Sequence, residues 1–160
     1  MKELDYPDAK LRSILNDTRT IAVVGASANW KRPSFFAMKY MQGKGYRMIP
    51  VNPGQAGKEI LGETCYASLS DIPDKVDMVD IFRNSDDAYQ VTKEAMEIDA
   101  NVVWMQLSVR NDKAAEEAEA AGLTVIMDRC PKIEYSRLFG ELGWGGINTG
   151  VISSKRRKGR

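Results

Sequence analysis

The sequence predicts an α/β protein with a doubly wound, Rossmann-like parallel sheet of about five strands in a three-layer α/β/α arrangement. Short apolar runs suited to strands alternate with longer segments whose apolar residues recur at helical spacing. The connections are short, which is typical of βαβ units whose right-handed crossovers lay helices on the sheet. The first apolar run, Ile21–Val24, contains no polar residue, as expected for a strand covered on both faces.

The elements of the first half follow from spacing, proline and glycine. Leu11, Ile14 and Leu15 recur at helical spacing. Pro33 suits the first turn of a helix, where its missing N–H costs no hydrogen bond, and Gly43 suits the end of that helix. These features predict a helix over 8–17, a strand over 21–24, a helix over 33–42, a strand over 46–51 and an irregular, turn-rich stretch over 54–75.

The elements of the second half follow from capping residues and further apolar runs. Asn84 and Asn111 each precede a helical pattern, and asparagine is a favoured N-cap residue. Pro131 again suits a first helical turn. We expect a strand over 76–82, a helix after Asn84 to about 98, a strand over 102–107, a helix ending near 122, a strand over 123–127 and a helix over 131–141.

Length and composition predict one domain over residues 1–142, followed by a glycine-rich and then basic tail over 143–160 that we expect to be flexible. There is no apolar run of about 20 residues and no apolar stretch behind the charged start, so we expect neither a membrane span nor a signal peptide. Two cysteines are too few for a disulfide scaffold, which predicts a cytoplasmic protein.

The absence of histidine narrows the chemistry. Without it, neither a Ser-His-Asp or Cys-His nucleophile nor a zinc site of the usual Cys/His type can form. The net charge is +1, but five basic residues lie in the tail over 155–160 and leave residues 1–154 at about −4. A mildly acidic body argues against a nucleic-acid-binding domain.

The loops that follow the predicted strands indicate where a ligand binds. In an open parallel sheet, ligands bind outside the carboxyl ends of the strands. These loops carry cations suited to a phosphorylated ligand, namely Lys31, Arg32, Arg83, Arg129 and Lys132. A glycine loop that opens onto a helix N-terminus is also a typical anion site. The alternatives are a tight turn with no ligand, and cations paired with nearby acids such as Asp80, Asp128 and Glu134.

Two features disfavour NAD as that ligand. A dinucleotide fold carries G-x-G-x-x-G after its first strand, whereas Gly25 is followed by Ala26-Ser27-Ala28-Asn29. Such a fold also places an acid after its second strand to hold the ribose hydroxyl, whereas this chain has Asn52. Asn52 tolerates a phosphate on the ribose, which leaves NADP and coenzyme A (CoA).

Several motifs, in the same order along the chain, carry a family resemblance. They are Val24-Gly25-Ala26-Ser27 with Arg32-Pro33-Ser34, then Gly45 to Pro53, Val79 to Arg83, Val103 to Gln106, and Met127 to Glu134. Over about residues 10–140, the chain resembles the small, single-domain CoA-binding proteins. More distantly, it resembles the CoA-binding N-terminal domain of the succinyl-CoA synthetase α subunit. The resemblance implies CoA bound at the strand ends, with its phosphates on the first loop.

The resemblance also implies roles for individual residues. Backbone N–H groups of Gly25, Ala26 and Ser27 would hold the pyrophosphate, with Arg32 and Ser34 beside them. The other implied roles are contact with the 3′-phosphate for Lys31, an adenosine pocket at Asn52 and Pro53, the pantetheine or phosphate path for Arg83, and further contacts at Gln106, Cys130 and Lys132.

The synthetase reaction needs a phosphorylated histidine on a further domain and a partner β subunit. This chain has no histidine, so the resemblance supports binding of CoA or an acyl-CoA without catalysis. An NADP-dependent oxidoreductase and a ligand-free interaction domain are the alternatives, and a homo-oligomer or a partner enzyme stays open.

Cys130 is a candidate for a mixed disulfide with the CoA thiol. It lies between Arg129 and Lys132, just before a predicted helix. Neighbouring cations and a helix N-terminus favour the reactive thiolate form of a cysteine. The alternative is a small packed residue.

Overall fold

A five-stranded parallel sheet forms the centre of the computed structural model, which describes residues 3–139. The strand order is β2-β1-β5-β6-β7, and every neighbouring pair is parallel. The strands are β1 (Thr20–Val24), β2 (Arg47–Val51), β5 (Met78–Ile81), β6 (Val102–Met105) and β7 (Thr124–Ile126). The predicted fold class is therefore confirmed.

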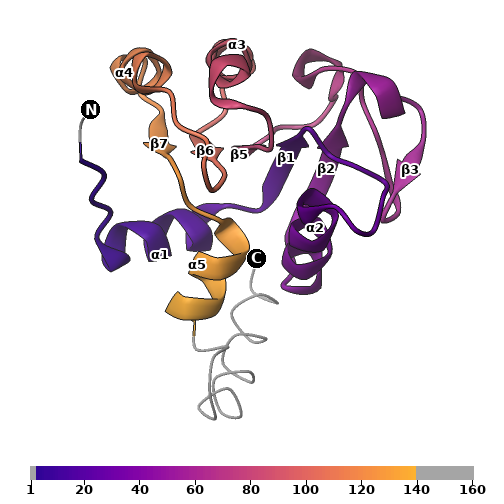
Figure 1. Cartoon of the computed structure of the whole chain (residues 1–160), viewed down its shortest axis with the longest axis horizontal. Helices are drawn as coiled ribbons and strands as arrows, with labels where there is room; N and C mark the ends of the chain where they lie inside the picture. The colour runs from indigo at the N-terminus through magenta and orange to yellow at the C-terminus, as the bar shows by residue number, and fades with distance from the viewer. Residues whose placement is uncertain (1–2, 140–160) are drawn as a thin grey trace.

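Helices cover both faces of this sheet (Figure 1). One face carries α1 (Asp8–Asp17), α2 (Pro33–Gly43) and α5 (Pro131–Leu138), and the other carries α3 (Ser85–Glu97) and α4 (Asp112–Ala120). Alternate residues along each strand point to opposite faces, so the sheet divides the buried apolar side chains into two clusters. Trp104 on β6 is fully buried in the cluster beneath α1, α2 and α5.

The strand order places a topological switch point between β1 and β5. From β1 the chain crosses through α2 to β2 on one side, and it later returns to β5 on the other side. The loops that follow β1 and β5 therefore leave the carboxyl edge in opposite directions and open a cleft between them. The order predicts the location of the ligand site before any side chain is considered.

The stretch between β2 and β5 covers the outer edge of β2. Asn52 N donates to Tyr66 O at 2.9 Å, and Tyr66 N donates to Pro50 O at 3.0 Å. The same stretch holds the short hairpin β3 (Glu59–Ile60) and β4 (Glu63–Thr64), and the single helical turns η1 (Pro53–Gln55) and η2 (Leu69–Asp71). The sequence predicted a turn-rich stretch here but not the hairpin.

The predicted strands are one or two residues longer than the observed ones at several ends. The run over 102–107 was expected to be extended throughout, but β6 ends at Met105 and Leu107 lies in a turn. The strand predicted over 76–82 begins too early because Val76 is apolar and buried although it precedes β5. The last helix ends at Leu138 rather than near 141, and the expected tail over 143–160 lies outside the described residues.

Gly25 is where the loop after β1 comes into contact with the loop after β5, at the switch point. Its φ of +92° is a backbone conformation that residues with a Cβ rarely adopt. A Cβ added at Gly25 would lie 2.5 Å from the carbonyl oxygen of Phe82, which follows β5. The close approach of these two backbones therefore requires glycine.

Asp80 is a buried acid in the middle of the sheet. It lies on β5 between Val23 of β1 and Trp104 of β6, and 1% of its surface is exposed. Its Oδ1 atom has no hydrogen-bond partner in the described structure. Burial raises the pKa of Asp80 well above that of an ordinary aspartate, because the charged form loses its hydration.

Gly25→Ala is expected to destabilise the protein by about 2–5 kcal/mol, from the strained φ together with the contact to Phe82 O. Gly57→Ala is the matched control, because Gly57 also has a positive φ (+87°) but nothing lies within 4 Å of its added Cβ. Urea denaturation should therefore show a smaller loss for Gly57→Ala, of about 1–2 kcal/mol. Equal losses would contradict the close approach at Gly25.

Asp80→Asn is expected to stabilise the protein at neutral pH. The folded chain keeps the Asp80 proton at pH values where the unfolded chain has lost it, so the stability contributed by this group falls as pH rises above about 4. The gap in melting temperature between Asp80→Asn and the parent should widen from pH 4 to pH 7. Asp71→Asn, at an exposed position, should show no such widening. A parent that is more stable than Asp80→Asn at pH 7 would show that the carboxylate is stabilised by a contact.

Candidate functional site

A cleft of about 390 Å³ lies at the switch point, beside the carboxyl ends of β1, β2 and β5. Its lining is mostly residues singled out from the sequence, namely Gly25, Ser27, Arg32, Pro33, Ser34 and Asn52, with Phe82 added. The structure thus brings together the loop after β1, the start of α2 and the end of β2. Phe82 was not among the predicted residues, because the sequence did not show that the loop after β5 meets Gly25.

Hydrogen bonds to the end of β2 and within the loop itself hold the loop after β1 in place. Gly25 N and Ala26 N both donate to Val51 O, at 2.9 and 3.4 Å. The Ser27 hydroxyl accepts from Asn29 N at 3.0 Å, and the Asn29 side chain accepts from Lys31 N at 3.0 Å. The amides of Gly25 and Ala26 are therefore engaged with the end of β2, although the resemblance implied that they hold a phosphate.

The N-terminus of α2 opens into this cleft without a counter-charge of its own. No side chain caps it, and its first turn contains no acid. Ser34 in that turn is 4% exposed, whereas Arg32, the residue before the helix, is exposed. The helix dipole favours an anion at such a site, where Ser34 N lies in the first turn, whereas Phe35 N already donates to Arg32 O at 3.0 Å.

Asn52 ties the end of β2 to the loop after β1. Its side-chain amide donates to Ala26 O at 2.8 Å, and its side-chain oxygen accepts from Gly54 N at 2.9 Å. Both polar groups of the side chain are used, so Asn52 shapes the cleft through the backbone that it holds. This role could not be predicted from the spacing of the sequence.

A neighbouring groove of about 350 Å³ lies between the end of β2 and α3, and Pro53, Ser68, Arg83 and Gln90 are among its lining residues. Arg83 Nη2 pairs with Asp87 at 2.7 Å, one turn into α3. Both partners are about 40% exposed on their side chains, so the pair contributes little to stability. Arg83 therefore remains at the border of the groove with one face toward solvent.

The predicted alternative, in which the site cations pair with Asp80, Asp128 and Glu134, is wrong for each of these acids. Asp80 accepts no cation in the described structure, the Asp128 carboxylate accepts Ser108 N at 2.7 Å, and Glu134 pairs with Arg137 at 2.7 Å. The alternative does hold for Arg83, which pairs with the nearby Asp87. Three other cations lie over aromatic rings, with Lys31 at 5.5 Å from Trp30, Lys132 at 5.3 Å from Tyr40 and Arg129 at 5.3 Å from Tyr6.

Gln106 and Cys130 lie farther along the same edge, after β6 and β7. Gln106 is 8% exposed, and its Oε1 atom has no partner in the described structure. Cys130 is 7% exposed and stands directly before α5, with no side-chain cap at that helix start. The loop after β7, which carries Cys130, is fixed to the buried Trp104, whose Nε1 donates to Arg129 O at 2.9 Å. These two residues do not line the cleft at the switch point.

Two residues in the left-handed conformation connect the loops after β6 and β7 by hydrogen bonds. Ser108 has φ +72° and Asp128 has φ +56°. Ser108 N donates to the Asp128 carboxylate at 2.7 Å, and Asp128 N donates to Val109 O at 3.1 Å. Non-glycine residues with positive φ are uncommon, and the others in the described residues, Leu61 and Asp99, lie in turns. From the sequence, Asp128 was named only as a possible partner of the site cations, and Ser108 was given no role.

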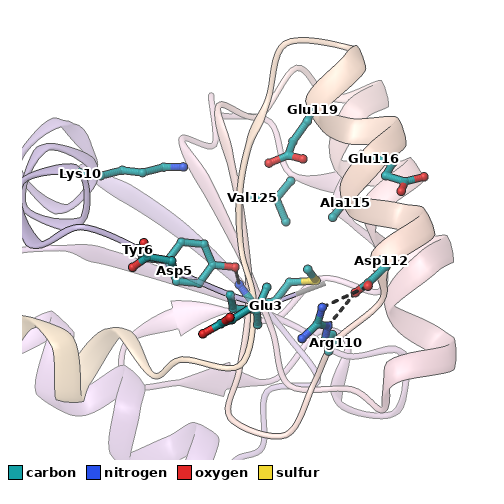
Figure 2. Close-up of a pocket in the computed structure, with 12 residues that line it drawn as sticks. Glu3, Asp5, Tyr6, Lys10, Arg110, Asp112, Ala115, Glu116, Glu119 and Val125 are labelled. Carbon is teal, nitrogen blue, oxygen red and sulfur yellow. Dashed lines mark hydrogen bonds and ion pairs between the residues drawn. The ribbon is translucent and has the colours of Figure 1, made fainter. Parts of the chain in front are cut away.

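A further cavity, of about 160 Å³, lies away from this edge, between the N-terminal segment and α4 (Figure 2). Its lining contains more acids than bases, with Glu3, Asp5, Asp112, Glu116 and Glu119 against Lys10 and Arg110. Arg110 is already paired with Asp112 at 2.7 Å (Figure 2). Burial also raises the pKa of Tyr6, whose hydroxyl accepts Met127 N at 2.9 Å. An acidic lining repels phosphates, so this cavity does not suit the ligand class that the other cleft favours.

The described residues form neither a metal site nor a membrane-spanning helix. Within residues 3–139, no group of histidine, cysteine, aspartate and glutamate side chains is arranged to hold a metal ion. The helices of the same range are too short or too polar to cross a membrane.

The fold and the cleft define a Rossmann-like α/β domain with an open site at its switch point. A family model described as "CoA binding domain" matches residues 19–136. The chain belongs to this CoA-binding domain family, which confirms the resemblance stated from the sequence.

Relatives of similar size share most of this chain. It is 39% identical over 128 residues to the uncharacterized protein YneT of Bacillus subtilis, a match that covers 80% of this chain and 93% of YneT. A hypothetical protein from Pyrococcus horikoshii is 37% identical, with a TM-score of 0.80 over 86% of this chain and 99% of that one.

A much larger protein shares part of the chain. The ADP-forming acetate–CoA ligase II of Archaeoglobus fulgidus is 37% identical over 79 residues, which are 48% of this chain but only 11% of the ligase.

Proposed function

We propose that this protein binds CoA along the carboxyl edge of its sheet and catalyses no reaction on it. The observation that carries the proposal is the start of α2, which has neither a capping side chain nor an acid in its first turn and opens into the cleft beside Arg32. A pyrophosphate supplies the negative charge that this helix end lacks.

The donors to the pyrophosphate are Ser27 and Ser34 together with Arg32. The amides of Gly25 and Ala26 serve the contact with Val51 O instead, and they set the position of Ser27. Lys31, which is exposed in the same loop, reaches the 3′-phosphate. Adenosine occupies the groove beside Pro53 and Arg83, where apolar Val24 and Val51 form part of the wall.

Pantetheine then extends from the cleft past Phe82 toward Gln106, Cys130 and Lys132. The direction follows from the strand order, since β6 and β7 lie on the side of β5 away from the adenosine groove. The unpartnered Gln106 oxygen suits an amide N–H of the pantetheine arm. Binding without catalysis is supported by the absence of histidine from the chain.

Isothermal titration with CoA, 3′-dephospho-CoA and NADPH tests the ligand. We expect binding of CoA that weakens when the 3′-phosphate is removed, because Lys31 loses a charged partner. Binding of NADPH without CoA would favour an NADP-dependent oxidoreductase. No binding of any of the three would favour a ligand-free interaction domain.

Arg32→Ala is expected to weaken CoA binding by about tenfold or more, as for the loss of a hydrogen bond between charged groups. Arg12→Ala is the matched control, because Arg12 is also exposed but lies on α1, away from the cleft. Comparable losses in the two variants would show that the attraction is a general charge effect and would contradict the site.

We propose secondly that Cys130 forms a mixed disulfide with CoA. The Cys130 thiolate attacks one sulfur of CoA disulfide, the protein–CoA bond forms, and the other CoA leaves as its thiolate, so no separate oxidant is needed. The position of Cys130 at the pantetheine end, before α5, supports this step. Burial of Cys130 requires the loop before α5 to open for the attack.

Mass spectrometry of the protein incubated with CoA disulfide checks the exchange. We expect a single CoA adduct that dithiothreitol removes and that Cys130→Ala does not form. Cys65→Ala should still form it, because Cys65 is packed with 1% exposure and burial raises the pKa of its thiol. An adduct that persists in Cys130→Ala would refute the assignment.

A further inference from the structure

The large apolar side chains that are most exposed gather at one edge of the molecule. They are Trp30, Phe36, Leu107 and Ile133, and they range from 47% to 63% exposed. Trp30 lies in the loop after β1, Phe36 in α2 near its start, Leu107 after β6, and Ile133 in the first turn of α5. All of these segments belong to the carboxyl edge, where the strands end. Such a concentration marks a surface that meets something apolar.

Leu107 is held outward by a strained turn. Val109 N donates to Gln106 O at 2.9 Å, and Ser108 in this turn has φ +72°. The bond from Ser108 N to the Asp128 carboxylate, at 2.7 Å, fixes the turn to the neighbouring loop. The Leu107 side chain is therefore exposed to solvent, and the turn that carries it is fixed to the loop after β7. Leu107 is next in sequence to the buried Gln106.

Phe36 and Ile133 each lie off the buried face of their helix. The buried residues of α5 are Pro131, Glu134, Tyr135 and Leu138, and those of α2 are Ser34, Ala37, Met38 and Met41. Positions 36 and 133 face away from the core, where polar side chains are common, so the apolar side chains of Phe36 and Ile133 do not contribute to the core.

The start of α5 lies against the second half of α2. Lys132, next to Ile133, lies with its Nζ 5.3 Å from the centre of the Tyr40 ring. Tyr40 is one helical turn after Phe36 on α2 and shares a face with it. Phe36 and Ile133 thus lie on neighbouring helices, α2 and α5, which cover the same face of the sheet (Figure 1). Together with Leu107 we call these residues the apolar rim.

We propose that the apolar rim holds the acyl chain of a CoA thioester, so that the preferred ligand is a medium- or long-chain acyl-CoA rather than free CoA. The proposal rests on the proposed function, because the rim lies beside Gln106 and Cys130, where the CoA sulfur is placed. An acyl group leaving that sulfur meets Leu107 after β6 and Ile133 after Cys130. Its methylenes would cover side chains that otherwise face water.

Titration with CoA, acetyl-CoA, octanoyl-CoA and dodecanoyl-CoA, below the micelle concentration of each, tests the chain. Affinity should rise at least tenfold from acetyl-CoA to octanoyl-CoA, because six methylenes are added and their burial is favourable. The double variant Leu107→Ser with Ile133→Ser should lose this rise. Ile98→Ser is the control, because Ile98 is a partly buried apolar residue at the end of α3, at the opposite edge of the sheet.

The outcomes separate the two proposals. If CoA itself fails to bind, the proposed function is wrong. If CoA binds and affinity does not depend on chain length, the function stands and the acyl proposal is overturned. Sedimentation that shows a dimer of the free protein, dissociated by the double variant, would assign the rim to a second copy of the chain and would also overturn it.

Discussion

The contact between the backbones at Gly25 and Phe82 is the constraint on which the site depends. A side chain at Gly25 would lie 2.5 Å from Phe82 O, so the loops after β1 and β5 meet only because glycine stands there. That contact, with the bonds of Gly25 N and Asn52 to their neighbours, fixes where α2 begins. The position of the anion site is therefore set by backbone geometry, and the long cationic side chains around it need only add charge.

Charge is distributed unevenly around this frame. The carboxyl edge carries Lys31, Arg32 and Lys132 without acid partners in the described structure, while the cavity beside α4 is lined mainly by acids. The interior adds a buried Asp80, which costs stability where it is ionised. The domain as a whole is slightly acidic. The positive electrostatic field that guides a phosphorylated ligand therefore arises from the placement of cations at the carboxyl edge and not from the net charge.

Much of the fold could be predicted from the sequence, because the periodicity of apolar residues and the caps at Asn84 and Asn111 are local signals. Both caps are confirmed, with bonds from Asp87 N at 2.8 Å and Ala114 N at 2.9 Å. The gathering of Ser27, Arg32 and Ser34 in one cleft followed from the rule for parallel sheets. The structural role of Asn52, the contact of Phe82 with Gly25 and the left-handed pair Ser108–Asp128 depend on pairings between distant loops, which no local pattern encodes.

Other parts of the same chain lie at both borders of the sheet, along β2 and just beyond the end of β7. Tyr66 bonds along the outside of β2, and the Tyr6 hydroxyl accepts Met127 N just beyond β7. A free strand border offers a row of donors and acceptors to any extended peptide, which is how sheets of different molecules join into aggregates. Just beyond β7, the N-terminal segment places the ring of Tyr6 and a single acceptor rather than another strand, so this border does not continue as a ladder past Ile126.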